Sequence, residues 1–226
     1  MPRSTPAYFS PETFRFLKEL AKHNDRDWFQ ANKPRYEEAV LQPAVRFVGE
    51  MGARLALSYP HVTYDARPFG GSVSRIYRDT RFSKDKSPYR TNVGIHFGHD
   101  AGGDEHLPGF FLHIAPGESV LYSGMWRPDP PQLKRIRDAI VADRRGWAKV
   151  RKSSPPVGGE SYARVPAGYA SDHEFGEDLR RKDFFASKEF TDAEVAAGSF
   201  ERSFLAGCAQ LDPLNSFLAQ AIGVEW

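Results

Sequence analysis

The densest group of side chains capable of chemistry lies in a 17-residue segment that runs from Ser74 to Arg90. Its charged side chains are six bases and two acids: Arg75, Arg78, Arg81, Lys84, Lys86, Arg90, Asp79 and Asp85. The segment carries +4, whereas the whole chain, with 31 Lys and Arg against 29 Asp and Glu, carries only +2. A planar guanidinium matches the oxygens of phosphate and carboxylate. The concentrated charge therefore predicts a local site for a small anionic ligand.

The residue types in this segment suggest individual roles. The bases would hold the anion, and Tyr77 and Tyr89 would donate their hydroxyls or stack on the ligand. Asp79 would orient an arginine or accept a proton as a general base. Because Ile76 and Phe82 interrupt the charges, we expect an ordered loop rather than a solvated charge run. There is an alternative: Arg and Asp residues at this spacing could form ion pairs with each other and hold the loop in place without a ligand.

Three classes of function fit such a segment. The first, which we favour, is a basic pocket for a phosphate- or carboxylate-bearing ligand, in an enzyme or in a non-catalytic protein. The second is nucleic-acid binding, since arginines contact phosphates and tyrosines stack on bases. The third is a protein-interaction module that docks an acidic partner. The net charge near zero argues against a protein that is basic over its whole surface, and these residues indicate neither a reaction nor a cofactor.

A stretch rich in histidine and acids follows, but its spacing matches no established metal motif. Its metal-capable residues are His96, His99, Asp100, Asp104, Glu105 and His106. Because a glycine-rich loop positions ligands poorly, we expect a solvated loop and no metal site. The sequence also lacks a phosphate-binding glycine loop, a Gly-x-Ser-x-Gly elbow, His-Glu-x-x-His and Cys-x-x-Cys.

Helices are predicted toward both ends of the chain from caps, prolines and apolar residues at steps of three and four. They begin at Ser10, at Asp25 and after Pro131, and they cover about 34–57, 193–206 and 213–222. Pro43 should kink or split the longest of them. Short β-rich segments between turns predict four strands, at 73–77, 92–97, 110–114 and 120–126, with antiparallel pairing. These elements define an α+β fold, a single domain whose central, mostly antiparallel sheet is flanked by N-terminal and C-terminal helices.

The expected organisation is a flexible tail over residues 1–7 and one domain over 8–226. A linker rich in Ser, Pro and Gly at 153–159 does not divide the chain, because the residues after it offer no second core. Cys208 is the single cysteine, and no apolar run has the length of a secretory leader or a membrane span. We therefore expect a soluble, cytoplasmic protein without membrane contact. The sequence does not indicate an oligomeric state.

The basic segment resembles the signature of the DUF2461 family of conserved bacterial proteins, over Arg75–Asp79 and Arg81–Arg90. Further positions that resemble the family's motifs are Asn24, Arg26, Trp28, Phe29, Gly124, Pro166–Tyr169, Asp172, His173, Leu179, Lys182 and Phe184. The resemblance covers about residues 8–222 and implies a single α+β domain, without an established reaction. It adds Lys182 to the ligand-binding candidates and His173 as a candidate acid or base. For His173 a capping or core role is the alternative that we favour.

Overall fold

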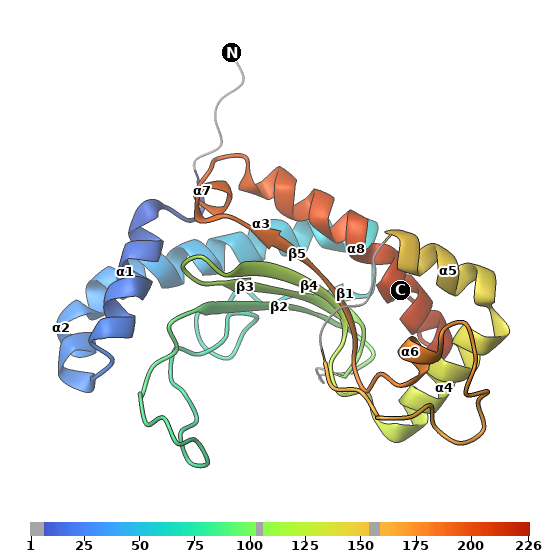
Figure 1. Ribbon diagram of the computed structural model, residues 1–226. Helices are drawn as coiled ribbons and strands as arrows, with labels where there is room; N and C mark the ends of the chain where they lie inside the picture. The colour runs from blue at the N-terminus through green and yellow to red at the C-terminus, as the bar shows by residue number, and fades with distance from the viewer. Residues whose placement is uncertain (1–6, 103–105, 154–158) are drawn as a thin grey trace.

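Five antiparallel strands form one sheet in the order β1-β2-β3-β4-β5 in the computed structural model (Figure 1). The structure describes residues 7–102, 106–153 and 159–226. The strands are β1 (Val62–Thr63), β2 (Val93–His99), β3 (Gly109–Ile114), β4 (Ser119–Met125) and β5 (Phe184–Phe190). The helices are α1 (Pro11–Lys22), α2 (Arg26–Tyr36), α3 (Gln42–Ser58), α4 (Pro130–Ala142), α5 (Arg144–Ser153), α6 (Gly176–Leu179), α7 (Asp192–Val195) and α8 (Phe200–Ile222). The predicted α+β class, in which helices precede and follow the central strands along the chain, is confirmed.

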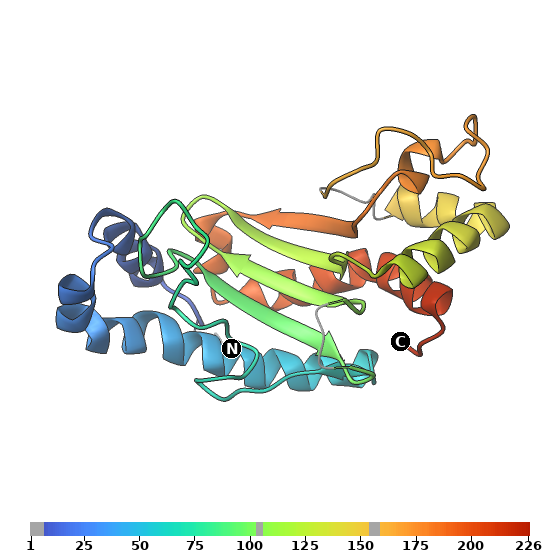
Figure 2. The same ribbon diagram turned by 90° about the horizontal axis from the view of Figure 1, so that it is seen from below.

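Two long helices cover one face of the sheet. α3 packs against β1 and β2, and α8 packs against β4 and β5 (Figure 1). Large buried side chains fill the space between the two layers, among them Phe97, Phe110, Leu121, Phe184 and Phe204. None of the helices in the described ranges covers the opposite face, which Figure 2 shows from below. The sheet is therefore buried on one side and open on the other, as an antiparallel sheet permits.

Two projections stand at opposite ends of the open face. Where β2 and β4 begin, residues 74–90 project below the sheet, and where β2 and β4 end, α4, α5, α6 and residues 159–182 form a small lobe (Figures 1 and 2). α4 and α5 contact each other and α8, so the lobe is attached to the same helix that covers the sheet. The open face is therefore bounded at both ends by segments that carry many of the predicted site residues.

The predicted helix starts at Ser10 and Asp25 are confirmed. The Ser10 hydroxyl accepts the Glu12 amide at 3.2 Å, and the Asp25 carboxylate accepts the Trp28 amide at 2.8 Å. Each cap satisfies an amide that has no partner within its own helix.

The break in the long N-terminal helix lies just before Pro43, where the sequence predicted a kink or split. Residues Glu37–Leu41 form a π-helical turn between α2 and α3. Proline has no amide hydrogen, so the Ala39 carbonyl four residues earlier loses its helical partner. The Thr13 hydroxyl of α1 donates to this buried carbonyl at 2.7 Å, so a neighbouring helix satisfies the break.

The predicted strand at 73–77 is wrong. These residues make only isolated bridges, from Val73 to Ile95 and from Tyr77 to Tyr89. The chain pairs with the edge of β2 at Val73 and then leaves the sheet. Further along, Tyr77 pairs with Tyr89, where the chain runs back toward β2. The segment therefore does not become a sixth strand.

The C-terminal region also differs from expectation. α8 is one helix that continues through Pro213, where the sequence predicted two helices. Pro213 deprives only the Ala209 carbonyl of its partner, and Ala209 is exposed, so water can take that place. β5 was not predicted at all, because Lys188 interrupts its apolar pattern.

Parts of three expectations lie outside the described residues: positions 1–6 of the tail, positions 154–158 of the linker, and Asp104 with Glu105. Within the parts that are described, no helix is both long enough and apolar enough to cross a membrane.

Candidate functional site

Residues 74–90, which we call the basic hairpin, fold back on themselves. Two backbone hydrogen bonds join the arms, from Arg78 N to Pro88 O (2.9 Å) and from Arg90 N to Ile76 O (2.7 Å). Tyr77 and Tyr89 form a bridge between them, with ring centroids 5.4 Å apart. The segment is therefore an ordered excursion with strand-like pairing at its base.

Tyr89 anchors the basic hairpin to the N-terminal helices. Its side chain is 2% exposed, and its ring stacks on Phe29 with 4.1 Å between centroids. The Asn24 side chain donates to the Tyr89 carbonyl and accepts from the Tyr89 amide, both at 3.0 Å. Two segments that resemble family motifs, distant in sequence, thus meet here. Because Tyr89 is buried in the core, the geometry gives no support to its predicted role as a ligand donor.

Four charged side chains of the basic hairpin form ion pairs with one another. Arg78 pairs with Asp85, and Arg81 pairs with Asp79 at 2.6 Å. Hydrogen bonds from Arg81 lower the pKa of the Asp79 carboxyl to about 2, because they favour the ionised form. A carboxylate with so low a pKa is a weak base near neutral pH. The geometry therefore gives no support to Asp79 as a general base.

Three cations of the basic hairpin, Arg75, Lys84 and Arg90, are exposed, and no carboxylate of residues 7–102, 106–153 or 159–226 lies within 4.0 Å of them. Lys86 donates to a hairpin carbonyl at 2.9 Å. Phe82 is 95% exposed, and the hairpin lines neither the cavity beside β4 and β5 nor the cavity in the lobe. Internal ion pairing thus accounts for part of the charge cluster and leaves a cationic surface.

His173 and Lys182 belong to the lobe at the other end of the sheet, so the structure does not bring them to the basic hairpin (Figure 2). His173 Nδ1 accepts the Phe175 amide, two residues later, at 3.1 Å. Its Nε2 is buried without a hydrogen-bond partner among the residues described. Lys182 pairs with Glu160 at 2.9 Å, and its Nζ lies 5.1 Å from the centroid of the Tyr162 ring.

The histidine-rich loop is held in part by protein atoms. His99 Nδ1 accepts the Ala101 amide at 3.0 Å, and Nε2 lies 2.6 Å from the Glu225 carbonyl, to which it donates. In the portion of the chain that is described, no three His, Cys, Asp or Glu side chains gather at metal-binding distance.

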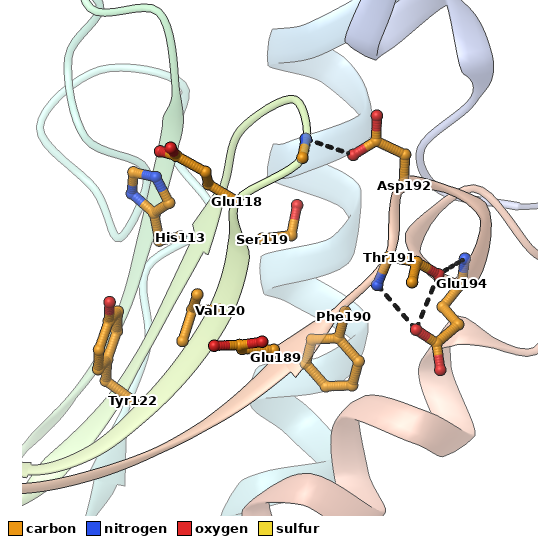
Figure 3. A pocket seen from close by; sticks show the side chains of 11 residues that line it. His113, Glu118, Ser119, Val120, Tyr122, Glu189, Phe190, Thr191, Asp192 and Glu194 are labelled. Carbon is orange, nitrogen blue, oxygen red and sulfur yellow. Dashed lines mark hydrogen bonds between the residues drawn. The ribbon is translucent and has the colours of Figure 1, made fainter. Parts of the chain in front are cut away.

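One cavity, about 590 Å³, lies where β4 begins and β5 ends (Figure 3). Four of its lining side chains are acidic: Glu118, Glu189, Asp192 and Glu194. Asp192 accepts the Gly117 amide at 2.8 Å, and Glu194 accepts the amide and hydroxyl of Thr191 (Figure 3). Burial lowers the pKa of His113, the histidine in the lining, which favours its neutral form. This cavity therefore repels phosphate and carboxylate.

The second cavity, about 460 Å³, lies in the lobe and has the opposite charge. It is lined by Arg137, Tyr162, Ala163, Arg164 and Pro166. Arg137 comes from α4, and the other four residues come from the segment that precedes α6. Two cations contact the Tyr162 ring, since the guanidinium carbon of Arg137 lies 5.5 Å from its centroid and Lys182 Nζ lies 5.1 Å from it.

Arg137 is the unusual residue of this cavity because it is a charged side chain that is only 6% exposed. Its Nε donates to the Leu179 carbonyl at 2.7 Å, and Nη2 donates to the Arg181 carbonyl at 2.8 Å. No carboxylate in the described parts of the chain lies within ion-pair distance of it. Burial lowers the pKa of Arg137, which means that its surroundings oppose the positive charge. Buried guanidiniums ordinarily have an anionic partner.

Arg137 was not among the site residues predicted from the sequence, although one signal was present. Arg137 follows Leu133 by four residues and precedes Ile140 by three, so it lies on the apolar face of α4. A charged residue at such a position is a sign of a buried charge.

The fold and these sites define a class: an α+β protein with a sheet covered on one side, a basic hairpin at one end and a basic cavity at the other. The family model described as "Conserved hypothetical protein (DUF2461)" matches residues 12–217. The chain therefore belongs to the DUF2461 family, as the sequence resemblance predicted. Comparison with curated proteins and with solved structures found no match.

Proposed function

We propose that this protein binds a small anionic ligand, bearing phosphate or carboxylate, in the cavity beside Arg137. The observation that carries the proposal is the buried guanidinium of Arg137, which has no carboxylate partner among the described residues. Taking a charge out of water costs several kcal/mol, and a bound anion would offset that cost. Arg164 in the lining and Lys182 beside the Tyr162 ring add positive charge.

This proposal keeps the ligand class expected from the sequence and moves the site. Of the binding residues predicted from the sequence, Lys182 is the one that lies beside the Tyr162 wall of this cavity. The cavity supplies hydrogen-bond donors and positive charge, so the proposal is one of binding, with no reaction assigned. A cytoplasmic location, where phosphorylated and carboxylated metabolites are abundant, is part of the same proposal.

Thermal unfolding with inorganic phosphate, and then with a panel of phosphorylated and carboxylated metabolites, tests the proposal. A ligand that binds the native state raises the unfolding temperature by mass action. Arg164→Gln changes an exposed residue and should weaken the shift while the fold is kept. Arg137→Gln should abolish the shift, with circular dichroism as the check that the variant is folded.

Two further variants make the outcome decisive. Arg144→Gln is the matched control, because Arg144 is an exposed arginine outside the cavity that pairs with Glu174 at 3.4 Å. It should respond to phosphate as the parent does. Arg81→Gln tests the basic hairpin instead. A shift that survives Arg164→Gln and disappears in Arg81→Gln would overturn the cavity as the site, and the absence of a shift with every anion would overturn the ligand class.

A further inference from the structure

Four aromatic side chains cross the open face of the sheet in a continuous row. We call Phe111, Tyr122, Phe185 and Trp126 the aromatic ladder. Successive ring centroids are 6.4, 5.8 and 6.4 Å apart. The strand register produces the row, since Phe111 lies opposite Tyr122 and Phe185 lies opposite Gly124, two residues further along β4. The rings are partly exposed, and Trp126 is 62% exposed.

Exposed aromatic side chains also stand beside cations at both ends of this face. On the basic hairpin, Tyr77 is 52% exposed and Phe82 is 95% exposed, with the guanidinium carbon of Arg81 5.9 Å from the Phe82 ring. On the lobe, Tyr162 is 45% exposed and Lys182 contacts its ring. Leaving so many large rings in water is unfavourable for a surface that binds nothing.

The distribution of charge on the open face indicates what kind of partner it would bind. The basic hairpin carries +4. Three of its cations, Arg75, Lys84 and Arg90, are exposed, and none has a carboxylate within 4.0 Å in the described part of the chain. These groups attract a phosphate backbone. The four carboxylates at the β4–β5 corner repel it, in a cavity that Tyr122 of the ladder also lines. A bound polyanion would therefore run from the hairpin across β2 and β3 and reach the ladder from its Phe111 end.

We infer that the open face binds single-stranded nucleic acid, with unpaired bases stacked on the aromatic ladder and phosphates held by the basic hairpin. Every base has a flat face, so stacking of this kind tolerates different sequences. In a duplex the bases stack on one another, and the ladder cannot reach them. An acidic protein segment would satisfy the cations but would leave the ladder without stacking partners. This inference does not depend on the Arg137 cavity.

Fluorescence anisotropy with a labelled oligouridylate or oligothymidylate of about 12 nucleotides tests the inference. The full chain should bind the single strand at ~50 mM salt and lose most of its affinity by ~200 mM, because phosphate contacts release counterions. A duplex of the same length should bind more weakly. No binding of the single strand at the lower salt concentration, or equal binding of strand and duplex, would overturn the inference.

Variants separate the two parts of the surface. Tyr122→Leu and Trp126→Ala should each weaken binding by about 5- to 150-fold, the range expected for losing a base–aromatic stack. Changing Arg75, Lys84 and Arg90 together to Gln should reduce the slope of log affinity against log salt by about 2. Arg54→Gln removes an exposed charge from α3, on the covered side of the sheet, and should change neither quantity.

A different result in the variants would reject the ladder. If Tyr122→Leu and Trp126→Ala bind as the parent does while both remain folded by circular dichroism, stacking plays no part. If polyglutamate displaces the oligonucleotide as well as an unlabelled strand does, the surface recognises charge alone and the partner is an acidic protein segment.

Discussion

The Asn24 side chain makes the two backbone hydrogen bonds to Tyr89 that a neighbouring β-strand would otherwise make. Its amide satisfies both backbone polar groups of Tyr89, a residue 65 positions later in the chain. A buried backbone group without a partner costs free energy comparable to a lost hydrogen bond, so this contact fixes the base of the hairpin. Spacing along the sequence gives no sign of the contact, because the tertiary packing brings together two residues that are 65 positions apart.

Replacing Asn24 by Ala should therefore loosen the basic hairpin. We expect a loss of about 1–3 kcal/mol in the free energy of unfolding, because two polar groups of Tyr89 lose their partner. Urea unfolding measures the loss, and hydrogen exchange should accelerate in 76–90. Asn32→Ala is the control, since Asn32 donates one hydrogen bond to the Trp28 carbonyl within its own helix. Hairpin exchange that stays at the parent rate would contradict this role of Asn24.

The sequence indicated the chemistry of the proposed site but not its place. Residue types suggested an anionic ligand, and they included Lys182, which lies beside the Tyr162 wall of the cavity. The other predicted residues do not line this cavity, because the fold decides which side chains come together. The ring of Tyr89 lies in the core, where it stacks on Phe29. Arg137 lines the cavity although it lies on the apolar face of α4. Arg and Asp in the hairpin also neutralise each other at close range, which spacing alone leaves open.

The pairing of β4 with β5 depends on one glycine. Gly124 has φ +135°, and a Cβ placed on it would lie 2.0 Å from the Phe184 carbonyl oxygen. That oxygen is backbone, so it cannot move aside without separating the two strands. The backbone of β5 therefore approaches β4 more closely than any side chain would allow.

The substitution Gly124→Ala should consequently be severe. We expect a loss above about 3 kcal/mol, because backbone strain and a clash with the sheet add together. Gly117→Ala is the matched control, since Gly117 also has positive φ (+77°) but a Cβ placed on it would meet nothing within 4 Å; it should cost about 1–2 kcal/mol. Urea unfolding of both variants gives the comparison, and similar losses would show that close approach of β5 is unimportant.

Strands at 92–97, 110–114 and 120–126 were predictable because these segments are short, β-rich and separated by turn residues, and each matches an observed strand closely. β5 escaped because Lys188 occupies an inward position between Ala186 and Phe190. Its aliphatic stem packs where α8 has Gly207, since a Cβ on that glycine would lie 3.2 Å from Lys188 Cδ. A charged side chain that buries its stem breaks the alternation without breaking the strand.

In the molecule as a whole, the two faces of the sheet have different surroundings. One face of the sheet carries the core that it shares with α3 and α8, and the other carries the aromatic ladder and the acidic cavity. The N-terminal helices extend the core past the end of the sheet, where Tyr36 packs against Phe16 and Phe29. Because Tyr36 is ionisable and lies in this core, its ionisation makes the free energy of unfolding depend on pH.

Tyr36 predicts an alkaline limit to that stability. Burial raises the pKa of Tyr36 to about 12, whereas an unfolded tyrosine ionises near pH ~10. Between these values the unfolded chain has lost the proton that the native state keeps, so the stability present below pH ~10 falls as the pH rises, by about 2–3 kcal/mol. Denaturant unfolding from pH ~9 to ~12 measures this decline. It should be shallower in Tyr36→Phe, and an identical slope in the variant would exclude Tyr36 as its source.

The position of α8 has a consequence for biosynthesis. α8 follows every other element of the chain, yet it covers the apolar face of β4 and β5 and meets α3, α4 and α5. A ribosome therefore delivers the sheet before its cover, and the buried face of two strands stays in water until residues 200–222 have left the exit tunnel. Nascent chains that stop short of this helix present a broad apolar sheet, the kind of surface that chaperones bind and that aggregates when they do not.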